Sequence, residues 1–382
     1  MYAWSIAEKA GGTMMNWKQA AWGTLGALAL LSAAACGGAT EPGGDAQSGK
    51  TVTDITVKDN PNTSVYQSFK LEKIDKLPNM RGVAWLSDDW IVSDKENTSM
   101  KPVIVEGQER YPHNLYMYDL AKGTDTPLKE SEVSLGSPLV SPDGQYLFYR
   151  EPEESTGKGF FLNLHNGETV NAGKEDGFVQ EGAWLDNQHV VFPNMKGDLV
   201  SASVDGTTKV LVQTGNFNVR SVRVSGSMIY YITGEDGQLN VYDTTTGDVK
   251  QVLKSVEWVI PSNDGTRLAI VKKTADTKRA LVLTDLEGNE KATLARGTQI
   301  FGTSWSGDDS KIAYTISSES DDEKGLFVSN TESAEQFQIS ADMGDISDPL
   351  AWSPEGNKIL LSQAVLQNES YHFVTSVITI SE

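Results

Sequence analysis

One hairpin recurs along the chain and limits the fold more than any other sequence feature. Each copy is a strand that ends in a large apolar residue, a short polar turn, and a second apolar strand. The turn reads Ser141-Pro142-Asp143-Gly144 in one copy and Ser353-Pro354-Glu355-Gly356 in the last. The residue that ends the first strand marks seven copies: Trp85, Val140, Trp184, Val224, Pro261, Trp305 and Trp352.

The spacing of these copies predicts the fold class. They lie 37 to 55 residues apart, which is the period of a four-stranded propeller blade. A second hairpin follows each copy, with turns such as Asn166-Gly167 and Asp205-Gly206 that supply positive φ. We therefore predict an all-β propeller over residues 64–382 with seven blades. Six blades are the alternative if the unit at Trp85 or Val224 fails. The last unit has room for three strands, so an N-terminal strand, Val65–Ile74, is expected to close the ring.

The N-terminal segment is interpreted as a lipoprotein signal peptide over residues 1–35, with residues 1–13 as an upstream extension. The apolar run Ala20–Leu31 ends in small residues before Cys36, the single cysteine. A transmembrane helix is the alternative, but Ala20–Ala35 has 16 residues and about 20 are needed to span a bilayer. We expect Cys36 to be acylated, with palmitate as one such chain. Residues 36–63 then form a flexible Gly-rich tether.

Composition narrows the classes of partner. The net charge of −20 argues against nucleic acid, which requires clustered Lys and Arg. Four His and one Cys leave little material for a metal site, and one chain cannot form a disulfide. We predict no metal, no cofactor and a monomer.

The turn motif resembles that of TolB-type, WD-repeat-like β-propellers of bacterial lipoproteins. The resemblance rests on the Ser-Pro-Asp-Gly turn after a Trp-ending strand, and on alternating strands before turns such as Thr246-Gly247. It covers residues 64–382, although the copies at Trp184 and Val224 lack the proline. It implies a propeller fold and says little about function.

Two sets of repeated residues have structural interpretations. Trp85, Trp184, Trp305 and Trp352 occupy one repeat position, where a large ring packs between blades; sugar stacking is the alternative. Four acidic residues lie in the turns, where a side chain caps its own backbone; calcium binding is the alternative. These four are Asp143, Asp264, Asp308 and Glu355.

Residues that do not repeat are the better candidates for a site. Blade-to-blade connections and mid-blade loops share one face, around the mouth of the central channel. His113 falls in the longest inserted loop, Ser93–Asn114. Arg81 and Arg220, near Glu181 and Asp348, are candidates for a polar ring at the channel entrance, although ordinary loop residues are the favoured interpretation. The full candidate set is Arg81, Tyr111, His113, Phe178, Glu181, Asn216, Arg220, Trp258, Phe301 and Asp348.

The leading functional hypothesis is a membrane-anchored extracytoplasmic lipoprotein that binds or scaffolds a cell-envelope protein or glycan. No catalytic constellation is evident, because there is no G-x-S-x-G motif and the four His lie far apart, so we predict no enzyme. The alternative is a carbohydrate-active lyase or hydrolase, or a small-ligand-binding propeller, with its site at the channel mouth. Glu181, His113 and Asp348 would then supply acid and base. The sequence does not distinguish the cell membrane from an outer membrane.

Overall fold

The computed structural model describes residues 69–105, 107–153, 155–178, 181–317, 324–341, 345–346, 348–367 and 370–381. All of these belong to the compact unit 55–382. The signal peptide, Cys36 and the tether lie outside the described residues, so these expectations stay predictions. Within the described ranges the chain has no helix that is long and apolar enough to cross a membrane.

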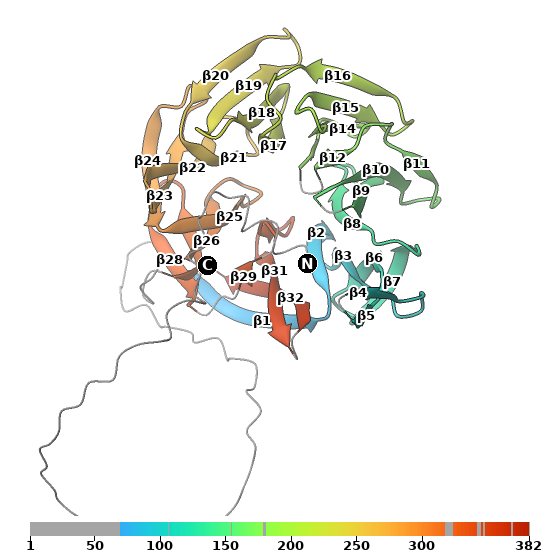
Figure 1. Cartoon of the computed structure of the whole chain (residues 1–382). Coiled ribbons are helices and arrows are strands. Elements are labelled where there is room, and N and C mark those ends of the chain that lie inside the picture. Colours follow the sequence, from blue (N-terminus) through green and yellow to red (C-terminus); the bar gives the residue numbers. More distant parts are fainter. Residues whose placement is uncertain are drawn as a thin grey trace, which may run out of the picture. The chain divides into compact units, whose positions relative to one another are not determined.

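Seven antiparallel sheets, formed by the described strands, follow one another around a ring (Figure 1). The predicted seven-bladed propeller is therefore confirmed, and six blades are excluded. The first three blades are β2 (Arg81–Ser87), β3 (Trp90–Glu96), β6 (His113–Asp119) and β7 (Thr124–Lys129); β8 (Gly136–Val140), β9 (Tyr146–Glu153), β10 (Thr156–Asn163) and β11 (Thr169–Asn171); and β13 (Ala183–Trp184), β14 (His189–Pro193), β15 (Leu199–Ser203) and β16 (Thr208–Val212).

The next three blades repeat the same strand order from the channel outward. They are β17 (Val219–Ser225), β18 (Met228–Thr233), β19 (Gln238–Asp243) and β20 (Val249–Leu253); β21 (Val256–Pro261), β22 (Leu268–Ala275), β23 (Lys278–Thr284) and β24 (Glu290–Gly297); and β25 (Gln299–Trp305), β26 (Lys311–Ser317), β27 (Gly325–Asn330) and β28 (Gln336–Ser340). Two additions depart from the pattern: β12 (Gly177–Phe178) pairs with β10, and blade 1 carries an inserted hairpin of β4 (Val103–Val105) and β5 (Gln108–Arg110).

An N-terminal strand closes the ring. Blade 7 consists of β29 (Asp345–Ile346), β30 (Ala351–Trp352), β31 (Lys358–Gln367) and β32 (Ser370–Ser381), with β1 (Lys70–Pro78) as its outermost strand. β1 pairs antiparallel with β32 from Lys70↔Ser381 to Pro78↔Val374. The predicted closure is confirmed, but the strand runs four residues further toward the C-terminus than expected, to Pro78 rather than Ile74.

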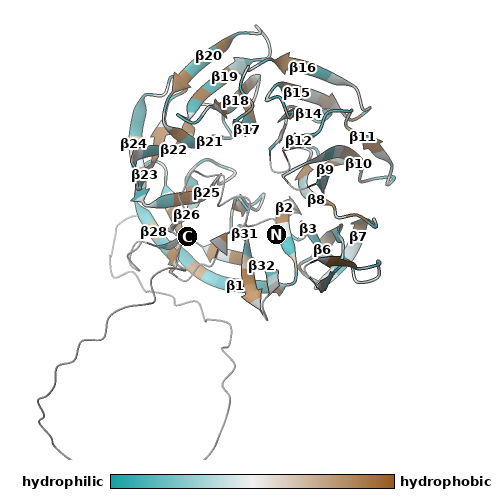
Figure 2. Cartoon of the chain, in the orientation of Figure 1, coloured by the Kyte–Doolittle hydropathy of each residue, from teal (hydrophilic) through white to brown (hydrophobic). Residues whose placement is uncertain are grey.

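The hydrophobic core is divided among the seams between blades. Seven clusters of buried apolar residues occur among the described residues, and each joins two neighbouring blades. One cluster packs Leu281 and Leu283 of blade 5 against Ile312 and Tyr314 of blade 6. Figure 2 shows apolar residues in the strands of every blade, whereas the outermost strand β1 is largely hydrophilic. No single blade buries both of its faces, so stacking supplies the core.

The repeated tryptophans join neighbouring blades at four of the seven seams, as the structural interpretation predicted. Each indole N–H donates to a backbone carbonyl of the preceding blade, at 2.9 to 3.1 Å. The pairs are Trp85 with Ala351, Trp184 with Leu139, Trp305 with Ile260, and Trp352 with Ser304. Their ring nitrogens are therefore already bonded.

Several innermost strands carry a β-bulge within the four residues before the marker position. Register shifts lie between Gly136 and Leu139, between Arg220 and Arg223, and between Phe301 and Ser304. Bulges re-aim side chains and are common next to functional sites. The channel mouth is thus lined by backbone that does not follow the regular pleat.

Candidate functional site

A cavity of about 470 Å³ lies at the seam between blades 7 and 1 and extends from Arg81 of the innermost strand outward to Asp125 of β7. Its walls include the connection Asn79–Met80, the end of β31–β32 at Tyr371–Phe373, and the loop residue Thr98. These are a blade-to-blade connection and mid-blade loops, the two kinds of segment that the sequence placed on one face. The side chains of Arg81, Asp94 and His113 also line it.

Arg81 and Asp348 form a bidentate ion pair at this seam. Arg81 Nε donates to Asp348 Oδ2 at 2.7 Å, and Nη2 donates to Oδ1 at 2.5 Å. Burial alone would lower the pKa of Arg81, but Asp348 and Asp94 outweigh it and the pKa is raised. Arg81 therefore stays charged. Its positive charge is balanced by the carboxylates of Asp348 and Asp94.

His113 and Asp94 form a second pair in the same cavity. His113 Nδ1 lies 2.8 Å from Asp94 Oδ1. The Asp94 side chain is 3% exposed, and that of His113 is 29% exposed. Since an ionised carboxylate can only accept, Nδ1 carries the hydrogen, and Nε2 is left with a lone pair. A carboxylate that orients an imidazole in this way is the arrangement of a general base.

Phe373 holds these two pairs in place. The Arg81 guanidinium lies 5.2 Å from the Phe373 ring centroid. The His113 ring meets the same phenyl ring edge-on, with centroids 6.2 Å apart. Asp94 Oδ2 lies 3.7 Å from Arg81 Nη1, which links the pairs. Three predicted residues, Arg81, His113 and Asp348, are thus brought together.

The other half of the expected polar ring is built separately, by blades 2 to 4. Glu181 Oε2 accepts the Val222 N–H at 3.0 Å, and Glu181 O accepts from Arg150 Nη2 at 3.1 Å. Burial lowers the pKa of Arg150 to about 10, against the opposing effect of Glu181 and Asp176. Arg220 instead donates to the carbonyl of Gly234 at 2.9 Å. The prediction of one ring that joins both arginines is not supported by the bonds, which form two groups on different blades.

The remaining candidates do not line the cavity. Tyr111 precedes β6, and Phe178 pairs with Thr156 in the short strand β12. Asn216 caps its own turn by accepting the Asn218 N–H. Phe301 is exposed on β25, and Trp258 lies on β21 beneath Arg223.

Sequence reasoning missed Asp94 and Phe373 and misplaced His113. The expected loop Ser93–Asn114 is shorter, because β3 continues to Glu96 and His113 begins β6. Glu96 pairs with His113 and Asp94 with Leu115, so Asp94 and His113 are diagonal neighbours across two strands. Only this register brings them together. The register cannot be read from the sequence, because the inserted hairpin β4–β5 separates β3 from β6.

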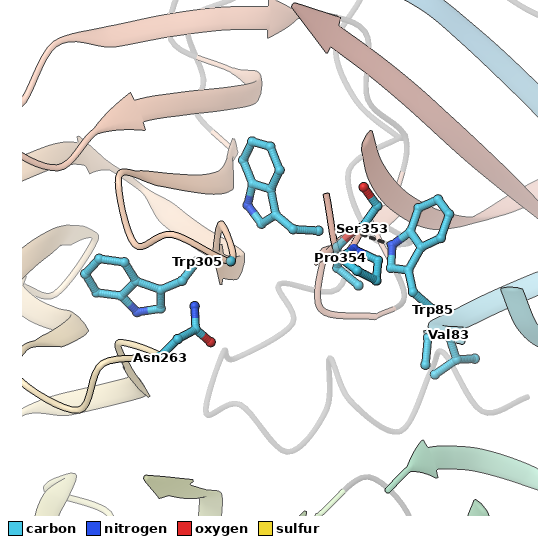
Figure 3. Close-up of a pocket in the computed structure, with 10 residues that line it drawn as sticks. Val83, Trp85, Asn263, Trp305, Ser353 and Pro354 are labelled. Atoms are coloured by element: carbon cyan, nitrogen blue, oxygen red, sulfur yellow. Dashed lines mark hydrogen bonds between the residues drawn. The ribbon is translucent and has the colours of Figure 1, made fainter. Parts of the chain in front are cut away.

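The opposite end of the channel is chemically different. A shallow hollow of about 310 Å³ is lined there by Trp85, Trp305 and Trp352, with Ser353 and Pro354 of the last repeated turn (Figure 3). Arg81 and Trp85 lie at the two ends of β2, roughly 13 Å apart at the usual rise of a strand. No ionisable side chain lines this hollow among the residues that the structure describes.

Potential metal ligands do not gather anywhere in the described part of the chain. No three His, Cys, Asp or Glu side chains there lie close enough to hold an ion.

No family model matches the chain, and no curated protein matches its sequence. Among solved structures it is similar to an oligogalacturonate lyase in complex with manganese, with a TM-score of 0.59 and 14% identity. An oligogalacturonate lyase from Vibrio parahaemolyticus has a TM-score of 0.60 and 11% identity. Each alignment covers 82% of this chain and 98% of the lyase. TolB from Acinetobacter baumannii has a TM-score of 0.48 and 16% identity, over 69% of this chain and 66% of that one.

These comparisons bear on two predictions. TolB propellers are among the similar structures. The seven sheets by themselves confirm the predicted propeller fold. The prediction of no enzyme is contradicted, because both lyases share the fold over nearly their whole length. The pairing of His113 with Asp94 could not be seen in the sequence, because the two residues lie on separate strands. Identities of 11 and 14% establish the fold and leave the activity to be argued from the site.

Proposed function

We propose that this chain is an enzyme that removes a proton from a carbohydrate bound in the cavity between blades 7 and 1. The supporting observation is the His113–Asp94 pair, with Nδ1 and Oδ1 2.8 Å apart, on the wall of that cavity. Asp94 fixes the tautomer and His113 Nε2 accepts the proton. Neither Ser nor Cys lines the cavity, which favours proton abstraction over acyl transfer.

The similar lyases suggest a uronic acid polymer as substrate. In β-elimination, His113 Nε2 takes the proton from the ring carbon next to the carboxylate. The C–H electron pair forms a C=C bond, the C–O bond to the next sugar breaks, and the leaving oxygen takes a proton from solvent. The base is needed because the C–H proton is only weakly acidic. Arg81 keeps Asp348 and Phe373 in place rather than contacting substrate, since two of its nitrogens already bond Asp348.

The test is turnover of oligogalacturonate, measured as ultraviolet absorbance of the conjugated double bond in the product. His113→Ala should lower kcat about 10²- to 10⁴-fold, the usual contribution of a general base. Asp94→Asn should lower it less and change its pH profile.

His189→Ala is the matched control. His189 also pairs with an aspartate, Asp186, at 2.9 Å, but it does not line the cavity. Full activity of the His113 variant, or equal losses in both variants, would overturn the proposal. A panel of neutral and acidic polysaccharides distinguishes elimination from hydrolysis, which releases reducing ends without the absorbance.

We further propose that the propeller is extracytoplasmic and is held to a membrane by lipid on Cys36. The support is the apolar run Ala20–Leu31 followed by small residues and the single cysteine. Metabolic labelling with an alkyne fatty acid should mark the wild type, while Cys36→Ser should lose the label and appear in the soluble fraction. Membrane retention of the unlabelled variant would contradict the assignment.

Binding of a cell-envelope protein is a second candidate function, favoured by one observation. Ile104 of the inserted hairpin is 67% exposed, and Leu366 near the β31–β32 turn is 59% exposed. Both belong to mid-blade hairpins, the segments that border the cavity. An Ile104→Ser, Leu366→Ser variant should lose a crosslinked envelope partner that the wild type retains, with turnover unchanged. Equal retention by both proteins would remove this candidate.

A further inference from the structure

The innermost strand of blade 4 contains a bulge that both neighbouring blades hold in place. Ser221 adopts a left-handed φ of 54°, and the pairing of β17 with β18 shifts between Arg220 and Arg223. From blade 3, Glu181 accepts the Val222 N–H at 3.0 Å, and from blade 5 the Val259 N–H donates to Ser221 Oγ at 3.2 Å. A left-handed conformation costs a residue other than glycine about 1 kcal/mol or more. The strained backbone of the bulge is therefore stabilised by contacts from both neighbouring blades.

Arg223 projects from this bulge with most of its hydrogen-bonding capacity unused. Its one side-chain hydrogen bond to a described residue is from Nη1 to the carbonyl of Val222, at 2.8 Å. A guanidinium has five N–H donors. The Arg223 guanidinium lies over the Trp258 ring of blade 5, 4.6 Å from the ring centroid. No carboxylate in the described part of the chain accepts a hydrogen bond from it.

Trp258 offers a further donor beside Arg223. Its Nε1 is buried and has no hydrogen-bond partner among the described residues. The four repeated tryptophans all satisfy this atom with a carbonyl. A buried N–H without a partner costs about 1–3 kcal/mol, so such groups are rare in native structures. Trp258 and Arg223 thus place side by side donors that no described residue accepts from.

The surrounding charge favours an anion. Burial lowers the pKa of Arg223 and of Arg220, and Glu181 is the acidic neighbour that opposes this for both. Glu257 is near Arg220 but already accepts two bonds from Arg279, at 2.9 and 2.8 Å. Asp236 acts on Arg220 as well, so Glu181 is the one acidic neighbour of Arg223 among the described residues, and Arg223 shares it with Arg220.

We propose that Arg223 and Trp258 form a carboxylate-binding subsite at the seam of blades 4 and 5. A carboxylate accepts paired bonds from the planar guanidinium fork, and the indole N–H supplies a further donor. A ligand whose carboxylate is carried on a sugar ring, as in a sugar acid, also has hydroxyl groups that can accept from the remaining N–H groups of Arg223. This subsite uses none of the residues of the His113–Asp94 pair, so it stands apart from the proposed reaction.

Fluorescence titration of Trp258 tests the subsite with defined probes: galacturonate, galactose, acetate and phosphate. A sugar-acid site should bind galacturonate, should not bind galactose, and should bind acetate more weakly. Equal binding of galacturonate and acetate would identify a simple carboxylate site without a sugar preference. Stronger binding of phosphate, or equal binding of galactose, would overturn the proposal.

Three variants test which side chains bind galacturonate. Arg223→Gln should weaken galacturonate binding about tenfold or more, because a charge-assisted pair is lost. Trp258→Phe, followed by calorimetry, keeps the ring and should weaken it less. Arg279→Gln is the control, since Arg279 is already paired with Glu257.

Unchanged binding in both Arg223→Gln and Trp258→Phe, with native circular dichroism, would overturn the assignment. Turnover of oligogalacturonate by His113→Ala tests the catalytic base, whereas binding of galacturonate by Arg223→Gln tests the subsite. A failure of the subsite can thus be told from a failure of the catalytic proposal.

Discussion

Trp305 and Trp258 lie on the inner strands of neighbouring blades but do different things. Trp305 occupies the repeat position, is 6% exposed, and donates Nε1 to the Ile260 carbonyl at 3.1 Å. Trp258 lies three residues before the repeat position of its own blade, and its Nε1 has no described partner. The repeated ring has its polar atom satisfied within the fold. The Nε1 of the unrepeated ring donates to no described residue.

The same contrast separates the two ends of the channel. The end with the repeated turns is lined by three tryptophans and no ionisable group of the described residues, whereas the other end carries Arg81, Asp94 and His113. A repeated residue has the same task in every blade, which is to join neighbours. Function therefore depends on positions at which one blade differs from the others.

The largest expected effect comes from removing a repeated tryptophan. Trp305→Ala should lower the free energy of unfolding by about 3–5 kcal/mol, because a cavity opens in the seam and the Ile260 carbonyl loses its donor. Trp258→Ala should cost less than half as much, since its ring is only partly buried. Urea unfolding of both variants measures the difference. Equal losses would break the distinction between the two tryptophans.

Strong alkali should act on the repeated core rather than on the channel mouth. Burial raises the pKa of Tyr149, Tyr231 and Tyr314 to about 12, whereas an unfolded tyrosine titrates near 10. Their contribution to stability is fully present below pH 10 and is lost as the pH rises through 12, by about 2–3 kcal/mol each. Tyr231→Phe should reduce this loss.

Tyrosinate absorbance and circular dichroism, followed together from pH 9 to pH 12, measure this transition. Ionisation that precedes unfolding, with no change in the Tyr231→Phe variant, would contradict the prediction. Arg81 should not contribute to it, because its pKa is raised.

A smaller effect is expected at Asp309, where one repeated turn departs from the others. Asp309 has a φ of 59° at the position that Gly144, Gly265 and Gly356 occupy in other copies. Its carboxylate accepts the N–H groups of Asn263 and Asp264 in the preceding blade, at 2.8 Å each. Asp309→Gly should relieve the backbone but lose these bonds, for a net loss of about 1–2 kcal/mol in urea unfolding. Asp309→Asn keeps one acceptor oxygen, so it should lose less stability than Asp309→Gly. A gain in stability on Asp309→Gly would show that the backbone strain outweighs the two hydrogen bonds.

The smallest effect should come from the second His–Asp pair. His189 and Asp186 are both exposed at a repeated turn. His189→Ala should change the free energy of unfolding by about 0.5 kcal/mol or less, as for most surface ion pairs. Thermal unfolding checks this, and a loss above about 1 kcal/mol would mean that the pair has a structural task in its turn.

Much of the fold was predictable because the repeat is local. The turns Ser141–Gly144 and Ser353–Gly356 are punctuated by residues with fixed backbone preferences, and the strands around them alternate. The candidate site was predictable only in part. Arg81, His113 and Asp348 were identified because they lie in unrepeated segments near the mouth, but their partners Asp94 and Phe373 are ordinary strand residues in the sequence.

The sequence alone predicted the order of the blades, the closing N-terminal strand and the role of the repeated tryptophans, and it favoured seven blades over six. These features follow from spacing, turn chemistry and hydrophobic alternation, which act over a few residues at a time. The tertiary structure decided which polar residues meet. Asp94 reaches His113 through the pairing of β3 with β6, and Arg223 reaches Trp258 because blades 4 and 5 are stacked. Such contacts depend on register and on the bulges of the inner strands, and neither leaves a periodic mark in the sequence.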